Sequence, residues 1–233
     1  MRLDKYLTQC FLGTRKEVKN IIKQKRIYIN NQLVTLESYN VDEKSDIVEL
    51  DDKVLKYQER YYYILNKPAG YVTSTNDLIN PTIMDLFDHL PSMLKGSLFP
   101  VGRLDKDTEG LIIVTNDGEF CHKVTSPNYQ IEKTYYVEFE GKLKNNAKEL
   151  LTNNIVLENV TFLPSKLEKI SDNSCYLTIT EGKYHQVKRM IHYLGAEVTY
   201  LKRVQIGKLI LPSDLDRGRY IEIDENKLKS TIS

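Results

Sequence analysis

Residues 102–110 contain the side chains of this sequence that are best placed to do chemistry. Three acids and two bases stand between Gly102 and Gly110, immediately before an apolar stretch. Flanking glycines let a backbone approach another molecule closely, and burial of Leu104 would direct the carboxylate of Asp105. A carboxylate beside a cation stays ionised, because the cation lowers its pKa by roughly 1–3 units. Such a group is suited to act as a nucleophile or a base, and not as a proton donor.

A structural ion pair is the alternative for each of these carboxylates. An aspartate close to an arginine more often serves structure than reaction. For Asp107 and Glu109 we expect capping or pairing on the surface, whereas Asp105 remains the candidate for chemistry.

The rest of the sequence gives no sign of a metal or a nucleotide cofactor. His185 and His192 stand two helical turns apart, about 10 Å in rise, which is too far to share an ion. Gly182 and Lys183 are followed by Tyr184 and not by Ser or Thr, so they do not form a phosphate loop. No GxGxxG or HExxH motif occurs. We therefore expect a reaction that uses neither a metal nor a cofactor.

Length and composition describe an ordinary globular chain. The 233 residues are 41% hydrophobic and 28% charged, with a net charge of +1, and predict one or two domains. No apolar run approaches the ~18 residues of a membrane span, and the charged start lacks the apolar stretch of a signal peptide. Three distant cysteines without a CxxC pair fit a reducing compartment. We expect a cytoplasmic protein that does not bind membranes.

Basic charge is concentrated near the N-terminus. Residues 1–34 hold eight basic and two acidic residues, and residues 35–59 hold three basic and eight acidic ones. A helix is expected after Gly13, beginning with a capping box formed by Thr14 and Glu17. Its apolar residues lie on one arc, and the opposite arc carries Lys16, Lys19 and Lys23, with Arg15 on its border. This face could follow RNA phosphates, or it could simply be a solvated surface.

Hydrophobic periodicity and turn residues predict the remaining elements. An amphipathic helix is expected over 3–11 and a hairpin over 27–34. A short helix is expected over 81–87, a loop over 91–100, and a frayed end after Lys227. A helix after residue 183 has one apolar face and an opposite face with His185, Lys188, Arg189 and His192. Strands are predicted at 61–65, 71–73, 111–114, 135–140, 175–180, 201–206 and 209–211.

Several motifs, in order along nearly the whole chain, resemble those of the rRNA pseudouridine synthases. They are NKPxG at 66–70, GRLD at 102–105, TEGL at 108–111, TNDG at 115–118, KTY at 133–135 and EGKYHQVKRM at 181–190. The YHQVKRM run is similar to that of the small-subunit (16S rRNA) enzymes, since large-subunit relatives usually carry an Asn-Arg-Glu/Gln-Val-Arg-Arg type of run there. The RLDKYL run at 2–7, with Thr14 and Arg15, resembles an S4 RNA-binding domain.

The resemblance implies an α+β fold with two domains. The first is a small S4-type RNA-binding domain over residues 1–58. The second, over residues 59–233, is a pseudouridine synthase domain with a mixed, largely antiparallel sheet flanked by helices. The S4 pattern usually has glycine at Lys25 and Asn-Gly at Asn30 and Asn31, which are left-handed turn positions that asparagine tolerates better than lysine.

The resemblance also implies roles for particular residues. Asp105 would attack the target uridine, so that the base detaches, rotates and rejoins the ribose through carbon. Arg103 would fill the gap left by the flipped uridine, Tyr135 would stack on the extruded base, and Lys188 would pair with Asp105. The residues alone would place Tyr135 in the core. His185 and Arg189 are expected either to meet RNA or to serve only as surface.

The predicted function is therefore site-specific isomerisation of a uridine to pseudouridine in 16S rRNA, without a cofactor. We expect a monomer that acts on an assembling small ribosomal subunit. Two alternatives stay open. One keeps the chemistry and moves the target to 23S rRNA, and the other is a non-catalytic, S4-type ribosome-assembly protein that uses the basic helix to bind RNA.

Overall fold

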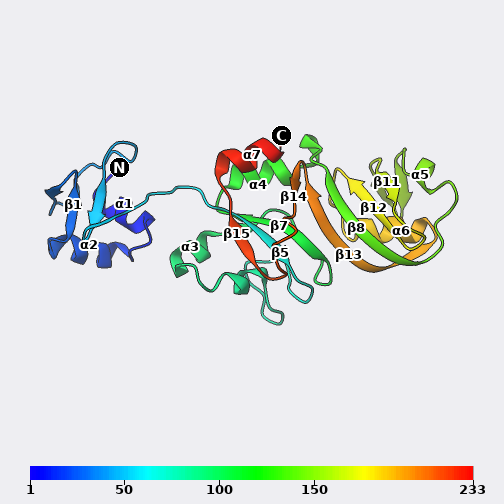
Figure 1. Ribbon diagram of the computed structural model, residues 1–233, viewed down its shortest axis with the longest axis horizontal. Coiled ribbons are helices and arrows are strands. Elements are labelled where there is room, and N and C mark those ends of the chain that lie inside the picture. The colour runs from blue at the N-terminus through cyan, green and yellow to red at the C-terminus, as the bar shows by residue number, and fades with distance from the viewer. Residues whose placement is uncertain (233) are drawn as a thin grey trace. The chain divides into compact units, whose positions relative to one another are not determined.

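The computed structural model describes residues 1–232, which form two compact units (Figure 1). One unit contains residues 1–60 together with 89–97. The other contains residues 61–88 and the chain from Leu98 onward. No helix among residues 1–232 combines the length and the apolar character needed to cross a membrane.

The first unit packs two helices on a small antiparallel sheet. The helices are α1 (Leu3–Gln9) and α2 (Arg15–Lys23), and the strand order is β2 (Gln32–Leu33), β1 (Ile27–Ile29), β3 (Val48–Leu50) and β4 (Lys53–Val54). The predicted capping box is confirmed, because Thr14 and Glu17 each bind the other's backbone N–H. The predicted hairpin is confirmed as β1 and β2, although the first helix ends at Gln9.

The left-handed turns expected in this unit are present. Lys25 has a φ of 60°, and Asn30 and Asn31 have φ values of 50° and 65°. The loop predicted over 91–100 is wrong, because this segment forms α3 (Ser92–Ser97) and then β6 (Phe99–Pro100). Leu94 buries its side chain, which stabilises a helix too short to show periodicity.

The second unit is built on a mixed, largely antiparallel sheet, as predicted. Its strand order is β11-β12-β8-β13-β7-β5-β15, with β14 on β13 and β6 on β7. The β13–β7 pair is parallel, and the other pairs of this sheet are antiparallel. The strand bounds are β5 (Tyr62–Lys67), β7 (Glu109–Thr115), β8 (Lys133–Gly141), β11 (Lys166–Lys169), β12 (Ser174–Ile179), β13 (Ala196–Ile206), β14 (Leu209–Ile210) and β15 (Tyr220–Glu222).

Two helices cover one part of this sheet and form a core with it. These helices are α4 (Gly118–Thr125) and α7 (Glu225–Ile232), which lie next to each other in Figure 1. Phe120, Leu228 and Ile232 pack there with Ile64 and Ile113 from β5 and β7. The frayed end predicted after Lys227 is therefore wrong for residues 228–232, because burial of the apolar residues of α7 holds the helix on the core.

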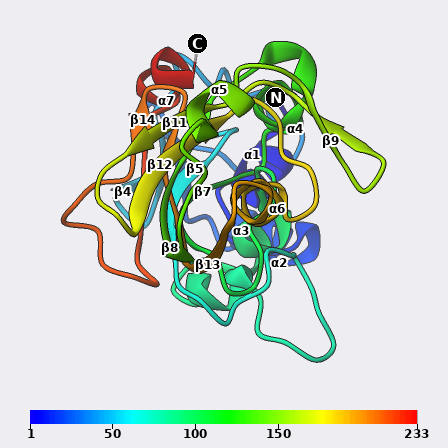
Figure 2. The ribbon, with the colours of Figure 1, turned by 90° about the vertical axis from the view of Figure 1, so that its right-hand side faces the viewer.

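The elements closest to the candidate site are a helix and a hairpin. Figure 2 shows α6 (Gln186–Tyr193) beside β13, with which it packs. The hairpin of β9 (Ile155–Leu157) and β10 (Val160–Phe162) was not predicted, because it is short. The predicted strand over 71–73 is reduced to one isolated bridge between Val72 and Thr82. Short helices lie at Ile83–Phe87, Pro127–Tyr129 and Ala147–Leu150 (α5).

Candidate active site

A buried lysine holds the loop that carries Asp105. Lys67 ends β5, and its side chain is fully buried. Its Nζ donates to the carbonyl oxygens of Asp105 at 3.1 Å, Lys106 at 3.2 Å and Thr108 at 2.8 Å, and lies 3.1 Å from that of Pro68. Burial lowers the pKa of Lys67 to about 8. The loop is therefore bound through its backbone, which leaves the Asp105 side chain free to point elsewhere.

Gly110 serves the packing of two strands. Its φ is +102°, and a Cβ built on it would lie 2.2 Å from the carbonyl oxygen of Arg203 in the parallel strand β13. The sequence suggested that the glycines flanking Asp105 allow close approach to another molecule. For Gly110 this expectation is wrong, because the backbone that approaches Gly110 closely belongs to β13 of the same chain.

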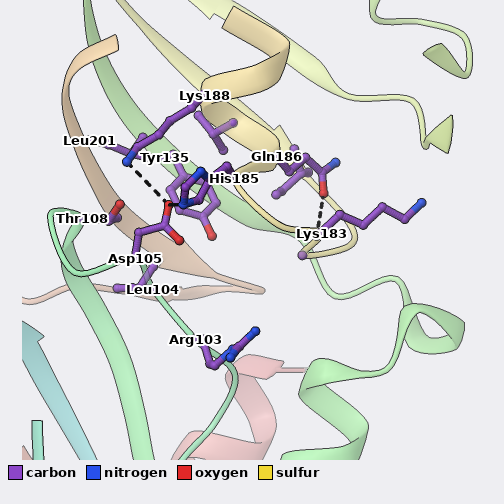
Figure 3. A pocket seen from close by; sticks show the side chains of 13 residues that line it. Arg103, Leu104, Asp105, Thr108, Tyr135, Lys183, His185, Gln186, Lys188 and Leu201 are labelled. Carbon is purple, nitrogen blue, oxygen red and sulfur yellow. Dashed lines mark hydrogen bonds and ion pairs between the residues drawn. The ribbon is translucent and has the colours of Figure 1, made fainter. Parts of the chain in front are cut away.

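The side chain of Asp105 lies at a pocket with about 400 Å³ of empty space (Figure 3). It is 31% exposed, whereas the preceding Leu104 is buried, as predicted. The hydroxyl of Thr73 donates to the Leu104 carbonyl oxygen at 2.8 Å and fixes the loop from the other side. The loop, β8, β12, β13, the turn at 182–185 and the start of α6 supply the residues that line the pocket, among them Arg103, Asp105, Thr108, Tyr135, His185, Lys188 and Leu201.

Two nitrogen-bearing side chains from one segment approach Asp105. Lys188 Nζ lies 3.6 Å from Asp105 Oδ2, and His185 Nε2 lies 3.7 Å from the same oxygen (Figure 3). Lys188 also donates to both oxygens of Asp107, at 2.8 and 2.7 Å. The two carboxylates thus share one ammonium, and of the two it is Asp105 that lines the pocket.

A buried glutamate organises the turn that precedes α6. Glu181 Oε1 accepts from the backbone N–H of Leu163 at 2.9 Å and from Gln186 Nε2 at 3.1 Å, and its Oε2 lies 2.8 Å from Lys183 Nζ. These contacts tie the end of β12 to the hairpin and to the first turn of α6. His185 lies within this turn, with a left-handed backbone (φ 50°, ψ 30°).

The other candidate residues of this unit lie in three different surroundings. Arg103 is exposed and lines the pocket. Tyr135 is 7% exposed and also lines the pocket, on the buried face of β8. Arg189 turns toward the hairpin, where its Nη2 donates to the carbonyl oxygen of Leu157 at 2.7 Å and lies 3.0 Å from Glu158.

The surface position expected for Glu109 is wrong. Its side chain is buried and accepts from the hydroxyl of Tyr200 at 2.7 Å, and Arg217 Nε lies 2.9 Å from it. No pattern in the sequence predicted that Lys67 binds the Asp105 loop or that Glu181 holds the turn before α6. The available signal for both was a charged residue at the end of an apolar strand.

The basic side chains of α2 that were predicted to bind RNA differ in exposure and in ion pairing. Arg15, Lys16 and Lys23 are exposed on α2. Lys19 is partly buried and pairs with Glu37, with 2.7 Å between Nζ and Oε2. Three of the four side chains are thus available to a partner without breaking that ion pair.

Family models identify the class to which this fold and site belong. Residues 61–193 match the model of RNA pseudouridylate synthases, and residues 1–48 match the S4 domain model. The chain belongs to the RNA pseudouridylate synthase family, so it is an isomerase, and an S4 domain precedes its synthase domain. The resemblance inferred from the motifs is confirmed.

Individual relatives are similar over the full length. The ribosomal small subunit pseudouridine synthase A of Haemophilus influenzae is 36% identical over 234 residues and covers 100% of both chains. The protein of that name from Escherichia coli K12 is 35% identical with the same coverage. An uncharacterized RNA pseudouridine synthase of Bacillus subtilis is 38% identical over 98% of this chain and 97% of its own. A crystal structure of a pseudouridylate synthase covers 100% of both chains at 36% identity, with a TM-score of 0.69.

Proposed function

We propose that this enzyme converts one uridine of small-subunit (16S) rRNA to pseudouridine and that Asp105 is its attacking carboxylate. The observation that carries the proposal is the position of Asp105. Its carboxylate faces a pocket, with Lys188 Nζ at 3.6 Å and His185 Nε2 at 3.7 Å. The small-subunit substrate is supported by the names of the full-length relatives and by the YHQVKRM run.

The reaction needs a flipped uridine and a reversible bond to the enzyme. An Asp105 oxygen forms a bond to the nucleotide, and the bond between N1 and the ribose breaks. The base rotates and rejoins the ribose through C5, and the bond to Asp105 breaks again, which frees the carboxylate. The proton leaves C5 and N1 gains one, so the product is an isomer. Lys188 places its positive charge 3.6 Å from the attacking carboxylate of Asp105.

Two further side chains act on the RNA around this step. Arg103, exposed beside the pocket, fills the place that the uridine leaves in its stack. Tyr135 presents its ring to the pocket and stacks on the extruded base. His185 and Arg189 contact RNA nearby, in the groove that α6 forms with the hairpin.

The basic face of α2 supplies affinity that does not depend on sequence. We assign RNA binding to residues 1–58, through Arg15, Lys16, Lys19 and Lys23, and catalysis to residues 59–233. The substrate would be an assembling small subunit in the cytoplasm, and the enzyme would act as a monomer.

A pseudouridine map tests the proposal directly. Cells that lack the protein should lose one pseudouridine from 16S rRNA, and an unchanged small-subunit map would reject the proposal. Loss of a site from 23S rRNA would instead support the large-subunit alternative. Complementation with Asp105→Asn should restore RNA binding but not the pseudouridine, whereas Asp172→Asn, on an exposed turn, should restore both. A non-catalytic assembly factor would behave the same with either variant.

A further inference from the structure

The side chain of Tyr184 is an exposed aromatic ring beside the candidate active site, and it takes no part in the reaction described above. Tyr184 is 74% exposed, more than any other tyrosine among residues 1–232. Its ring is stacked on that of His185, with 3.8 Å between centroids and 18° between planes. Since His185 covers one face of the ring, the exposed fraction leaves the opposite face open to solvent.

The backbone holds this stacked pair in an unusual conformation. His185 has a φ of 50°, in the left-handed region, which histidine adopts more often than most residues other than glycine. The turn is held on both sides, since Lys183 N donates to Gln186 Oε1 at 3.1 Å and the His185 carbonyl accepts from Arg189 N at 2.9 Å. These two hydrogen bonds fix the backbone that carries the stacked rings.

His185, on which the Tyr184 ring is stacked, also connects two hollows of the surface. His185 and Lys188 line the Asp105 pocket and also the adjacent groove between α6 and the β9–β10 hairpin. That groove is open to solvent beside the pocket, so it is accessible to the RNA next to the target uridine. His185 Nε2 lies 3.7 Å from Asp105, so a base stacked on this pair would be a neighbour of the reacting nucleotide.

We propose that Tyr184 and His185 form a stacking platform for the RNA base next to the target uridine. When the uridine flips out and Arg103 takes its place in the stack, a neighbouring base stacks on the open face of Tyr184. An aromatic platform accepts any base, because every base has a π-face. The platform therefore increases affinity for the flipped RNA without choosing its sequence. This inference rests on the proposed function and deepens it.

Kinetics of ring variants test the platform. Tyr184→Leu keeps an apolar side chain and removes the π-face, so we expect KM for a small-subunit rRNA fragment to rise about ten-fold, with kcat within about two-fold. Tyr184→Phe keeps the ring and should behave as the wild type. The matched control is Tyr129→Leu, since Tyr129 is 51% exposed and meets His122 edge-on at 88° without stacking. That control should leave both constants unchanged.

A fluorescent base supplies the direct readout. The fragment would carry 2-aminopurine on one or the other side of the uridine that the wild type converts, bound to Asp105→Asn so that no turnover occurs. We expect quenching at one of the two sides, retained with Tyr184→Phe and lost with Tyr184→Leu.

Two outcomes for Tyr184→Leu would contradict the stacking platform. Equal KM and equal quenching for Tyr184→Leu and the wild type would overturn the platform. A fall in kcat with unchanged KM would show that the ring acts on the target uridine and not on its neighbour, which also overturns it. If the wild type forms no pseudouridine in small-subunit RNA, it is the proposed function that fails.

Discussion

The ammonium of Lys188 lies 2.7 Å from Asp107 Oδ2, closer than the 3.6 Å that separates it from Asp105 Oδ2. Partial desolvation raises the pKa of Asp107, but the hydrogen bond and charge of Lys188 outweigh this, and the net pKa is below its usual value. Asp107 therefore holds Lys188 in place, and Lys188 remains close enough to act on Asp105.

Replacing Lys188, the cation that Asp105 and Asp107 share, should slow pseudouridine formation more than replacing Asp107. Lys188→Met leaves two neighbouring carboxylates without their counter-charge, so we expect kcat for pseudouridine formation to fall roughly 10²-fold. Asp107→Asn leaves Lys188 beside Asp105, and the loss should stay within about ten-fold. Single-turnover rates on small-subunit RNA measure both. Equal losses in the two variants would contradict this order and would mean either that Lys188 cannot act on Asp105 without Asp107 or that Asp107 takes a direct part in the reaction.

The low pKa of Lys67 predicts how stability depends on pH. Burial lowers this pKa from 10.5 to about 8, so between these values the unfolded chain binds more protons than the folded one. The contribution of Lys67 to the free energy of unfolding therefore rises with pH across this window. In Lys67→Met, the increase between about pH 8 and pH 9.5 should shrink by on the order of 1–2 kcal/mol. Urea titrations at both pH values measure it, and Lys166→Met, 78% exposed, should retain the wild-type increase.

The close approach of β7 and β13 predicts a strongly destabilising glycine substitution. Gly110→Ala would place a Cβ 2.2 Å from the Arg203 carbonyl oxygen at a φ of +102°. We expect the free energy of unfolding to drop by more than about 2 kcal/mol. The control is Gly118→Ala in α4, where a Cβ meets nothing within 4 Å, and it should be neutral or slightly stabilising. A wild-type Tm for Gly110→Ala would contradict the observed strand contact.

The lysines of α2 should contribute unequally to RNA affinity. Replacing Lys16 and Lys23 by Gln should flatten the dependence of log Kd on log salt by about 0.7 for each phosphate that the protein no longer neutralises on single strands, and slightly more on duplex. Lys19→Gln should change the slope less, because Lys19 already pairs with Glu37. Filter binding across a range of salt concentrations measures this. An unaltered slope in the double variant would mean that this face is only solvated surface.

Local patterns in the sequence predicted the elements well where they are long and regular. The capping box at Thr14 and the strands at 111–114 and 135–140 were predicted correctly, because helix and strand periodicities depend on neighbours in the chain. Short elements such as α3 and the β9–β10 hairpin were missed, since a few residues do not show a period.

The sequence by itself determined the class of enzyme and singled out Asp105, because those signals lie within continuous motifs. Only the tertiary structure showed that Lys67 binds the Asp105 loop, that Lys188 is shared with Asp107 and that Gly110 makes room for β13. The physical reason is distance along the chain. Lys188 and Asp107 are 81 residues apart, and such contacts follow from strand order and register, which no local pattern encodes.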